Sequence, residues 1–244
     1  MRNERYRNEW KYLISPGKHL LLRPRLETAM QLDPHAKDGG YTIRSLYFDD
    51  FWNTAYVEKE GGVHLRKKYR IRIYNFSDRT IKLERKKKVG SYIYKEDAPL
   101  TRSQVEDIVQ GRYDFLLASE HSLCREFYIE CVCNGMRPRT IVDYEREPWI
   151  MELGTVRLTF DSEVRAAVGG WDIFDPSMTA LQDAARADGG DGCGGLLPPE
   201  RRGLHGAAAR GQRRAGCDAG AVQRRIPWIS RASSNGLRWA RRFC

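Results

Sequence analysis

The chain has 244 residues, of which 41% are apolar and 30% are charged, and its formal net charge is +10. This balance predicts that most of the chain folds, as one large domain or two small ones. No run of about 18 apolar residues occurs, so we expect no transmembrane helix. The first residues lack an apolar core, so we expect no secretory signal peptide. Six cysteines without a CxxC pair argue against a zinc site or a disulfide scaffold, and we expect a cytoplasmic protein.

Short strands and helices alternate along the first 180 residues. Residues 7–14 alternate charged and apolar side chains, which is typical of a strand. Ser15 and Pro16 follow as an N-cap and a first helical residue, and Pro24 is expected to kink or shorten this helix. Thr101 and Gln104 form a capping-box pattern, which predicts a helix over about 102–110. The segment 119–133 predicts another helix, and further strands are predicted over 41–49, 66–76, 80–88, 139–147 and 155–161.

The composition changes after about residue 181. Residues 1–180 contain 30 basic and 27 acidic residues, whereas 181–244 contain 12 and 5, so the last quarter carries most of the excess positive charge. This last part holds 12 Arg, 11 Gly and 11 Ala but no Lys, Tyr or Thr. No strand or helix period is visible in it. Two interpretations are open, a disordered basic tail and the translation of a GC-rich gene in the wrong reading frame.

Basic residues are concentrated between Arg66 and Lys95, where there are 12 of them and only two acidic residues. Because side chains alternate along a strand, most of the basic residues of each predicted strand share one face and the apolar residues share the other. Like charges that face each other across a sheet repel, so solvent or a polyanion must neutralise this face. The charged face consists of Arg66, Lys68, Arg70 and Arg72 on one strand and Lys82, Glu84, Lys86 and Lys88 on the next.

The alternation of a charged and an apolar face recurs in the strands predicted over 7–14, 139–147 and 155–161. If the charged faces point inward, the strands form a barrel around a tunnel lined with Arg and Lys. Arg matches phosphate oxygens with two parallel hydrogen bonds, and Lys adds a compact charge. The few acids would then hold a divalent cation, Mn²⁺ or Mg²⁺, that bridges phosphates. These candidate metal ligands are Glu9, Glu84 and Asp161. The alternative is a cationic face that is simply solvated.

Six segments between about residues 5 and 180 carry a resemblance to a known family. They are Arg7-x-Glu9-x-Lys11-Tyr12, Ser45-Leu-Tyr-Phe-Asp49, Lys68-Tyr-Arg-Ile-Arg72, Leu83-Glu-Arg-Lys86, Val142-Asp-Tyr-Glu-Arg146 and Arg157-Leu-Thr-Phe-Asp161. In this order they resemble the VTC-type polyphosphate polymerase domain, a branch of the triphosphate tunnel metalloenzymes. The resemblance implies an α+β fold, in which an antiparallel β-barrel forms the tunnel and helices pack outside. It also implies transfer of the ATP γ-phosphate to a polyphosphate chain with Mn²⁺ or a similar metal.

The resemblance also assigns site residues by position. Arg70, Arg72, Lys86 and Arg146 are the expected catalytic residues, which hold the reacting phosphates. The further phosphate-binding residues expected are Lys11, Lys68, Lys82, Lys95, Tyr144 and Arg157. The expected partners are therefore ATP and polyphosphate, and no nucleic acid. The first strand departs from the wider family, because Arg7 stands where that family has its first Glu.

A larger departure concerns the C-terminal part. The family closes its tunnel with a late strand that reads roughly Glu-x-Lys-Tyr, and nothing in 181–244 matches it. We therefore expect residues 5–180 to form an incomplete tunnel domain whose last strands are missing, and 181–244 to be an Arg/Gly/Ala tail. The late Glu is the principal metal ligand that the resemblance implies, so its loss leaves two expectations open, an inactive form and an active form with an incomplete metal site. The alternatives are a triphosphatase of the same fold, in which water replaces the acceptor, and a non-catalytic module that binds a polyanion.

Overall fold

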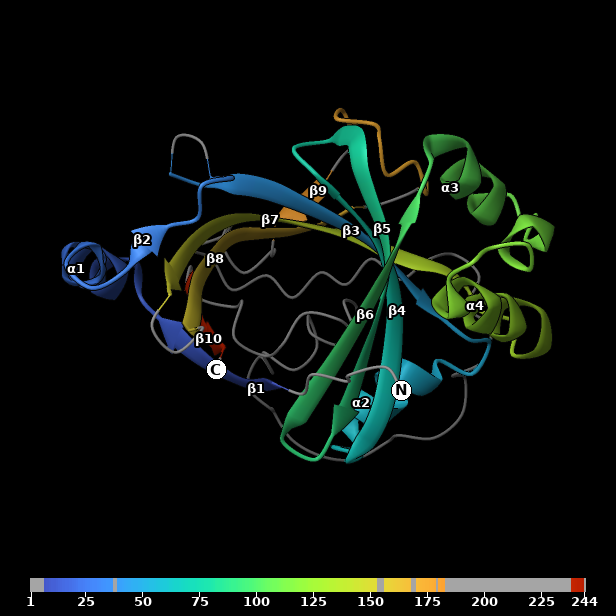
Figure 1. The fold of residues 1–244 in the computed structure, drawn as a ribbon, viewed down its shortest axis with the longest axis horizontal. Helices are drawn as coiled ribbons and strands as arrows, with labels where there is room; N and C mark the ends of the chain where they lie inside the picture. Colours follow the sequence, from blue (N-terminus) through green and yellow to red (C-terminus); the bar gives the residue numbers. More distant parts are fainter. Residues whose placement is uncertain are drawn as a thin grey trace, which may run out of the picture.

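The computed structural model of the chain describes residues 7–36, 39–152, 156–167, 170–178, 180–182 and 238–243. Within these residues, ten strands form one antiparallel sheet, and four α-helices lie around it (Figure 1). The strands are β1 (Arg7–Ile14), β2 (Gln31–Leu32), β3 (Tyr41–Asp49), β4 (Leu65–Tyr74), β5 (Ser77–Val89), β6 (Tyr92–Leu100), β7 (Arg137–Met151), β8 (Val156–Ala167), β9 (Ala180–Gln182) and β10 (Arg238–Phe243). The helices are α1 (Pro16–Glu27), α2 (Thr54–Glu60), α3 (Arg102–Val109) and α4 (Ser122–Cys133).

The order of the strands brings distant parts of the chain into one curved sheet. The sheet runs β2-β7-β3-β4-β5-β6-β1-β10-β8-β9, and β7 also pairs with β8. The pairings therefore lead from β7 through β3, β4, β5, β6, β1, β10 and β8 back to β7. The link between β1 and β6 consists of two residue pairs, Arg7 with Ile93 and Asn8 with Tyr92. The predicted α+β class, with an antiparallel sheet and helices outside it, is confirmed (Figure 1).

The C-terminal strand β10 corrects the expectation that the last strands are missing. Arg238–Phe243 lies between β1 and β8 and pairs antiparallel with both. Ala180–Gln182 likewise pairs with β8 as β9. The unpaired edges of β1 and β8 present backbone N–H and C=O groups, and any extended segment can form hydrogen bonds with them. A strand that pairs in this way need not have a characteristic composition or side-chain period, so the sequence does not reveal it. The predicted tail otherwise falls on residues 183–237 and 244, which lie outside the described residues.

The helices α3 and α4 cover one face of β3, β4, β5 and β6, which we call the outer face (Figure 1). Tyr69 and Ile71 of β4 and Leu83 of β5 are fully buried there. They belong to the same apolar core as Ile108 of α3 and Phe127 of α4. The opposite face, which we call the inner face, carries Arg70 and Arg72 of β4 and Lys82 and Lys86 of β5. Burial of the outer face therefore determines which side chains turn inward.

Local signals in the sequence explain most of the element boundaries. Ser15 accepts a hydrogen bond from the Lys18 backbone N–H at the start of α1. The capping box at α3 is present as predicted. The helix α1 continues through Pro24 to Glu27, so the proline does not shorten it as expected. The strand β6 and the seven-residue helix α2 were not predicted from the sequence. None of the helices in the described ranges has the length and apolar character needed to cross a bilayer.

Candidate functional site

The candidate site lies on the inner face, where β4 and β5 are paired residue by residue. Arg70 stands opposite Glu84 and Arg72 opposite Lys82 in the register of these strands. The neighbouring strand β6 places Lys95 opposite Lys86. The alternation predicted for both strands is confirmed, because Ile71 and Leu83, which lie between these charged residues, are buried in the outer-face core. The register thus gathers charges from three strands on one face.

A buried carboxylate, Glu84, is surrounded by three cations. The Arg70 guanidinium donates a hydrogen bond of 2.6 Å from Nε to Glu84 Oε2. Arg72 Nη1 and Lys95 Nζ lie 3.6 and 2.5 Å from Glu84 Oε1. Burial would raise the pKa of Glu84, but the three cations outweigh this effect and lower that pKa below its usual range. The Glu84 carboxylate therefore occupies a position that strongly favours negative charge.

Hydroxyl groups hold the two arginines from the other side. Arg70 Nη1 donates to the Tyr47 hydroxyl at 3.0 Å, and Arg72 Nη2 donates to the Tyr144 hydroxyl at 3.1 Å. The Ser45 hydroxyl lies 3.5 Å from Arg72 Nε. Tyr144 was predicted as a site residue, but Ser45 and Tyr47 were not, although their alternation in the predicted strand over 41–49 could have indicated a shared face. These contacts fix the guanidinium groups before any ligand arrives.

A second ion pair extends the site across β7 and β8. Arg146 and Asp161 stand opposite each other in the register of these strands. Two hydrogen bonds of 2.8 and 2.9 Å join the guanidinium to the carboxylate, and both residues are buried. The Arg146 guanidinium also lies 5.1 Å from the centroid of the Tyr144 ring. Tyr144 therefore contacts both this pair and Arg72, which joins the two charge clusters.

Lys86, Lys11 and Glu9 form a third group on the inner face. The Lys86 ammonium contacts Glu9 Oε2, and Lys11 Nζ lies 3.6 Å from Glu9 Oε1. Burial lowers the pKa of Lys86 well below its usual range; the Glu9 carboxylate opposes this shift, and the nearby ammonium groups of Lys11 and Lys68 add to it. A bound anion would reverse this shift, because it supplies the negative charge that the buried ammonium needs.

The remaining predicted phosphate-binding residues lie farther from these groups or bind other partners. The Lys68 ammonium lies 5.5 Å from the centroid of the Tyr47 ring. Lys82 pairs with Asp97 at 3.0 Å, and its side chain is 38% exposed. Arg157 pairs with Asp33 at 3.2 Å, and its side chain is 49% exposed. The structure therefore brings together a central set of six basic residues with three carboxylates. The set comprises Lys11, Arg70, Arg72, Lys86, Lys95 and Arg146 with Glu9, Glu84 and Asp161.

Comparison with protein families shows which family the chain belongs to. A family model described as "VTC domain" matches residues 6–188, which is more than half of the chain. The chain belongs to the VTC domain family. A search of curated proteins finds no match. The matched range covers β1 to β9, so it contains every residue of the central set described above.

Solved structures with low sequence identity also match the VTC domain. One is a putative adenylate cyclase from Bacillus halodurans, with 12% identity and a TM-score of 0.44 over 68% of this chain and 76% of that chain. Another is a putative adenylyl cyclase from Hippeastrum, described as having a dominant triphosphatase activity, with 14% identity and a TM-score of 0.42 over 64% and 71%. A third is the PH1819 protein from Pyrococcus horikoshii OT3, with 13% identity and a TM-score of 0.35 over 65% and 71%.

The three candidate metal ligands of the VTC domain are not gathered into one cluster. Glu9, Glu84 and Asp161 each contact basic side chains instead. Among the described residues, no group of three His, Cys, Asp or Glu side chains could hold a metal ion. The role of these carboxylates as metal ligands stays a prediction.

The low pKa of Lys86 predicts how anion binding depends on pH. We expect the affinity of the VTC domain for tripolyphosphate to fall as the pH rises toward the ordinary lysine pKa of about 10.4, because burial lowers the pKa of Lys86 and this lysine loses its charge before an ordinary lysine does. Calorimetric titrations in two buffers measure both the affinity and the protons taken up on binding. The variant Lys86→Met should show weaker binding with little pH dependence, whereas Lys59→Met in α2 should behave like the unmodified chain. Equal affinity across this rise in pH would contradict the expectation.

Proposed function

We propose that the VTC domain binds the triphosphate of ATP on its inner face and transfers the γ-phosphate to a polyphosphate chain. The observation that carries the proposal is the convergence of Arg70, Arg72 and Lys95 on one buried anionic position, now held by Glu84. Three cations around a single carboxylate leave net positive charge in a site shielded from water. A triphosphate and an acceptor phosphate supply the negative charge that such a site attracts.

Phosphoryl transfer suits a site built in this way. The attacking and leaving oxygens must lie in line, and charge spreads over the oxygens of the transferred group. Arginine side chains that are already held in place stabilise this charge without reorganisation. The contacts of Arg70 with Tyr47 and of Arg72 with Tyr144 provide that order. In this proposal Arg70, Arg72, Lys86 and Arg146 position the phosphates, and no side chain forms a covalent intermediate.

The carboxylates of the inner face support transfer to a phosphate acceptor rather than to water. Hydrolysis is helped by a side chain that removes a proton from the attacking water. Glu84 is a poor base, because its neighbouring cations lower its pKa below the usual range, and Asp161 accepts two hydrogen bonds from Arg146. The terminal phosphate of a polyphosphate chain is already an anion and needs no such base. This chemistry supports a polymerase over a triphosphatase.

The test is to incubate the full chain with ATP and Mn²⁺ and to measure ADP, orthophosphate and acid-labile polyphosphate together. The proposal expects ADP and polyphosphate to form in parallel, with little free orthophosphate. A variant with both Arg70→Gln and Arg72→Gln should form neither product. Release of orthophosphate without polyphosphate would instead identify a triphosphatase. Binding of ATP without release of ADP would identify a module that holds a polyanion without chemistry.

A further inference from the structure

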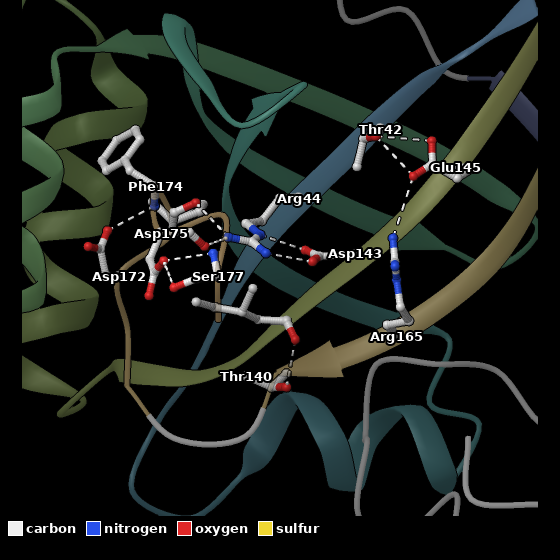
Figure 2. A network of polar contacts seen from close by, with 12 residues as sticks. Thr42, Arg44, Thr140, Asp143, Glu145, Arg165, Asp172, Phe174, Asp175 and Ser177 are labelled. Carbon is white, nitrogen blue, oxygen red and sulfur yellow. Dashed lines mark hydrogen bonds and ion pairs between the residues drawn. The ribbon is translucent and has the colours of Figure 1, made fainter. Parts of the chain in front are cut away.

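A buried ion pair joins β3 and β7 on their outer face, away from the phosphate site. Arg44 and Asp143 stand opposite each other in the register of the two strands, and they are 2% and 3% exposed. Arg44 Nε and Nη2 donate to Asp143 Oδ1 and Oδ2, each at 2.8 Å (Figure 2). Such a planar, two-pronged contact holds two strands in one register more strictly than apolar packing does.

The same guanidinium group also holds the segment 170–178 against the sheet. Arg44 Nη1 donates to the backbone carbonyls of Ile173, at 3.4 Å, and Asp175 (Figure 2). The Arg44 guanidinium further lies 4.5 Å from the centroid of the Phe76 ring. All of these contacts lie on the outer face, so none of them can touch a ligand bound on the inner face.

The residues next to this pair point to the inner face and hold Arg72. Ser45 follows Arg44 in β3, and its hydroxyl lies 3.5 Å from Arg72 Nε. Tyr144 follows Asp143 in β7, and its hydroxyl accepts from Arg72 Nη2 at 3.1 Å. A small shift between β3 and β7 would therefore move both groups that orient the Arg72 guanidinium.

We propose that Arg44 and Asp143 are positioning residues, which fix β3 against β7 and so hold Ser45 and Tyr144 in place around Arg72. This inference rests on the proposed function, because it takes Arg72 as a group that binds phosphate. A buried ion pair is weak evidence for stability, since apolar residues of similar size often replace one without loss. The ion pair matters here for the geometry of the site, because it specifies one arrangement of β3 against β7.

The chain offers a matched control on the same two strands. Glu145 and Asp143 are the two neighbours of Tyr144 in the chain. The Glu145 carboxylate accepts hydrogen bonds of 2.9 and 3.0 Å from the Thr42 hydroxyl (Figure 2). It also pairs with Arg165 at 3.5 Å, but its side chain is 41% exposed. The variant Glu145→Gln therefore removes a charge at the same distance along the chain from Tyr144 without disturbing a buried contact.

The experiment compares tripolyphosphate affinity, measured by calorimetry, in a double-mutant cycle. The double variant Arg44→Met with Asp143→Leu removes both charges together, so that no buried charge is left unpaired. We expect it to bind tripolyphosphate about tenfold more weakly than the unmodified chain. In a background that already carries Arg72→Gln, the same double variant should change the affinity by less than about twofold. Glu145→Gln should leave the affinity unchanged in both backgrounds.

Equal losses of affinity in both backgrounds would overturn the inference, because they would show a general structural defect. Unchanged affinity of the double variant would overturn it as well. A second measurement, by NMR spectroscopy, needs no ligand. The chemical shift of the Arg72 Nε–Hε resonance should change in the double variant and stay the same in Glu145→Gln. If ATP transfer fails while this resonance moves as expected, the proposed function is wrong and the positioning role of Arg44 and Asp143 remains. If transfer succeeds and the resonance does not move, only the positioning role is wrong.

Discussion

Replacing Arg72 with glutamine is expected to lower kcat for phosphate transfer by about 10²–10³-fold, as does the loss of one preorganised donor in other enzymes. Arg72 is 5% exposed, and its contacts with Tyr144 and Glu84 place its guanidinium at the centre of the site. Its charge therefore acts on the transferred group with little screening by water. Glutamine retains one hydrogen-bond donor group but lacks the positive charge and the second donor group of the guanidinium. Initial rates of ADP formation at saturating ATP measure the effect.

The control for this prediction is an arginine on one of the same strands but outside the site. Arg79 of β5 is exposed, so Arg79→Gln should change kcat by less than about twofold. The unfolding midpoint of both variants should be measured in parallel, since a large loss of stability in Arg72→Gln would confuse the comparison. A folded Arg72→Gln variant with nearly full activity would show that this arginine does not act on the transferred phosphate.

Replacing Glu84 with glutamine is expected to lower the free energy of unfolding by about 3–5 kcal/mol in the absence of anions. Glu84 is 1% exposed and is the shared partner of Arg70, Arg72 and the partly exposed Lys95, so its loss leaves two mostly buried guanidinium groups that repel each other. Tripolyphosphate should restore more stability to this variant than to the unmodified chain, because it supplies the missing negative charge and binds only the folded state. Urea unfolding with and without tripolyphosphate measures both effects.

The stabilising effect of Glu84 should depend on pH in a definite direction. The pKa of Glu84 in the folded chain is lowered, so its stabilising effect is fully present above the ordinary pKa of about 4.3 and is lost as the pH falls through the lowered value. The exposed Glu106 pairs with Arg102 in α3 and serves as the control, because Glu106→Gln should cost no more than about 0.5 kcal/mol. A Glu84→Gln variant as stable as the unmodified chain would mean that the cations around this position do not strain the fold.

The sequence by itself determined the faces of the strands. A period of two places Arg70 and Arg72 on the face opposite Tyr69 and Ile71, and the structure confirms this division. The capping box at Thr101 was equally visible, because its hydrogen bonds join residues that are close in the chain. The family resemblance, which the family model confirms, rested on the same short segments. All these signals are local, so no knowledge of the tertiary structure was needed.

Only the tertiary structure decided which of these side chains meet. The period of a strand gives its faces but not its register against a neighbour, and a shift of the register changes every contact partner. Register places Glu84 among three cations rather than beside Glu9 and Asp161, and it brings Ser45 to Arg72. The strand β10 was invisible in the sequence for a related reason, because its hydrogen bonds to β1 and β8 use backbone groups that every residue carries.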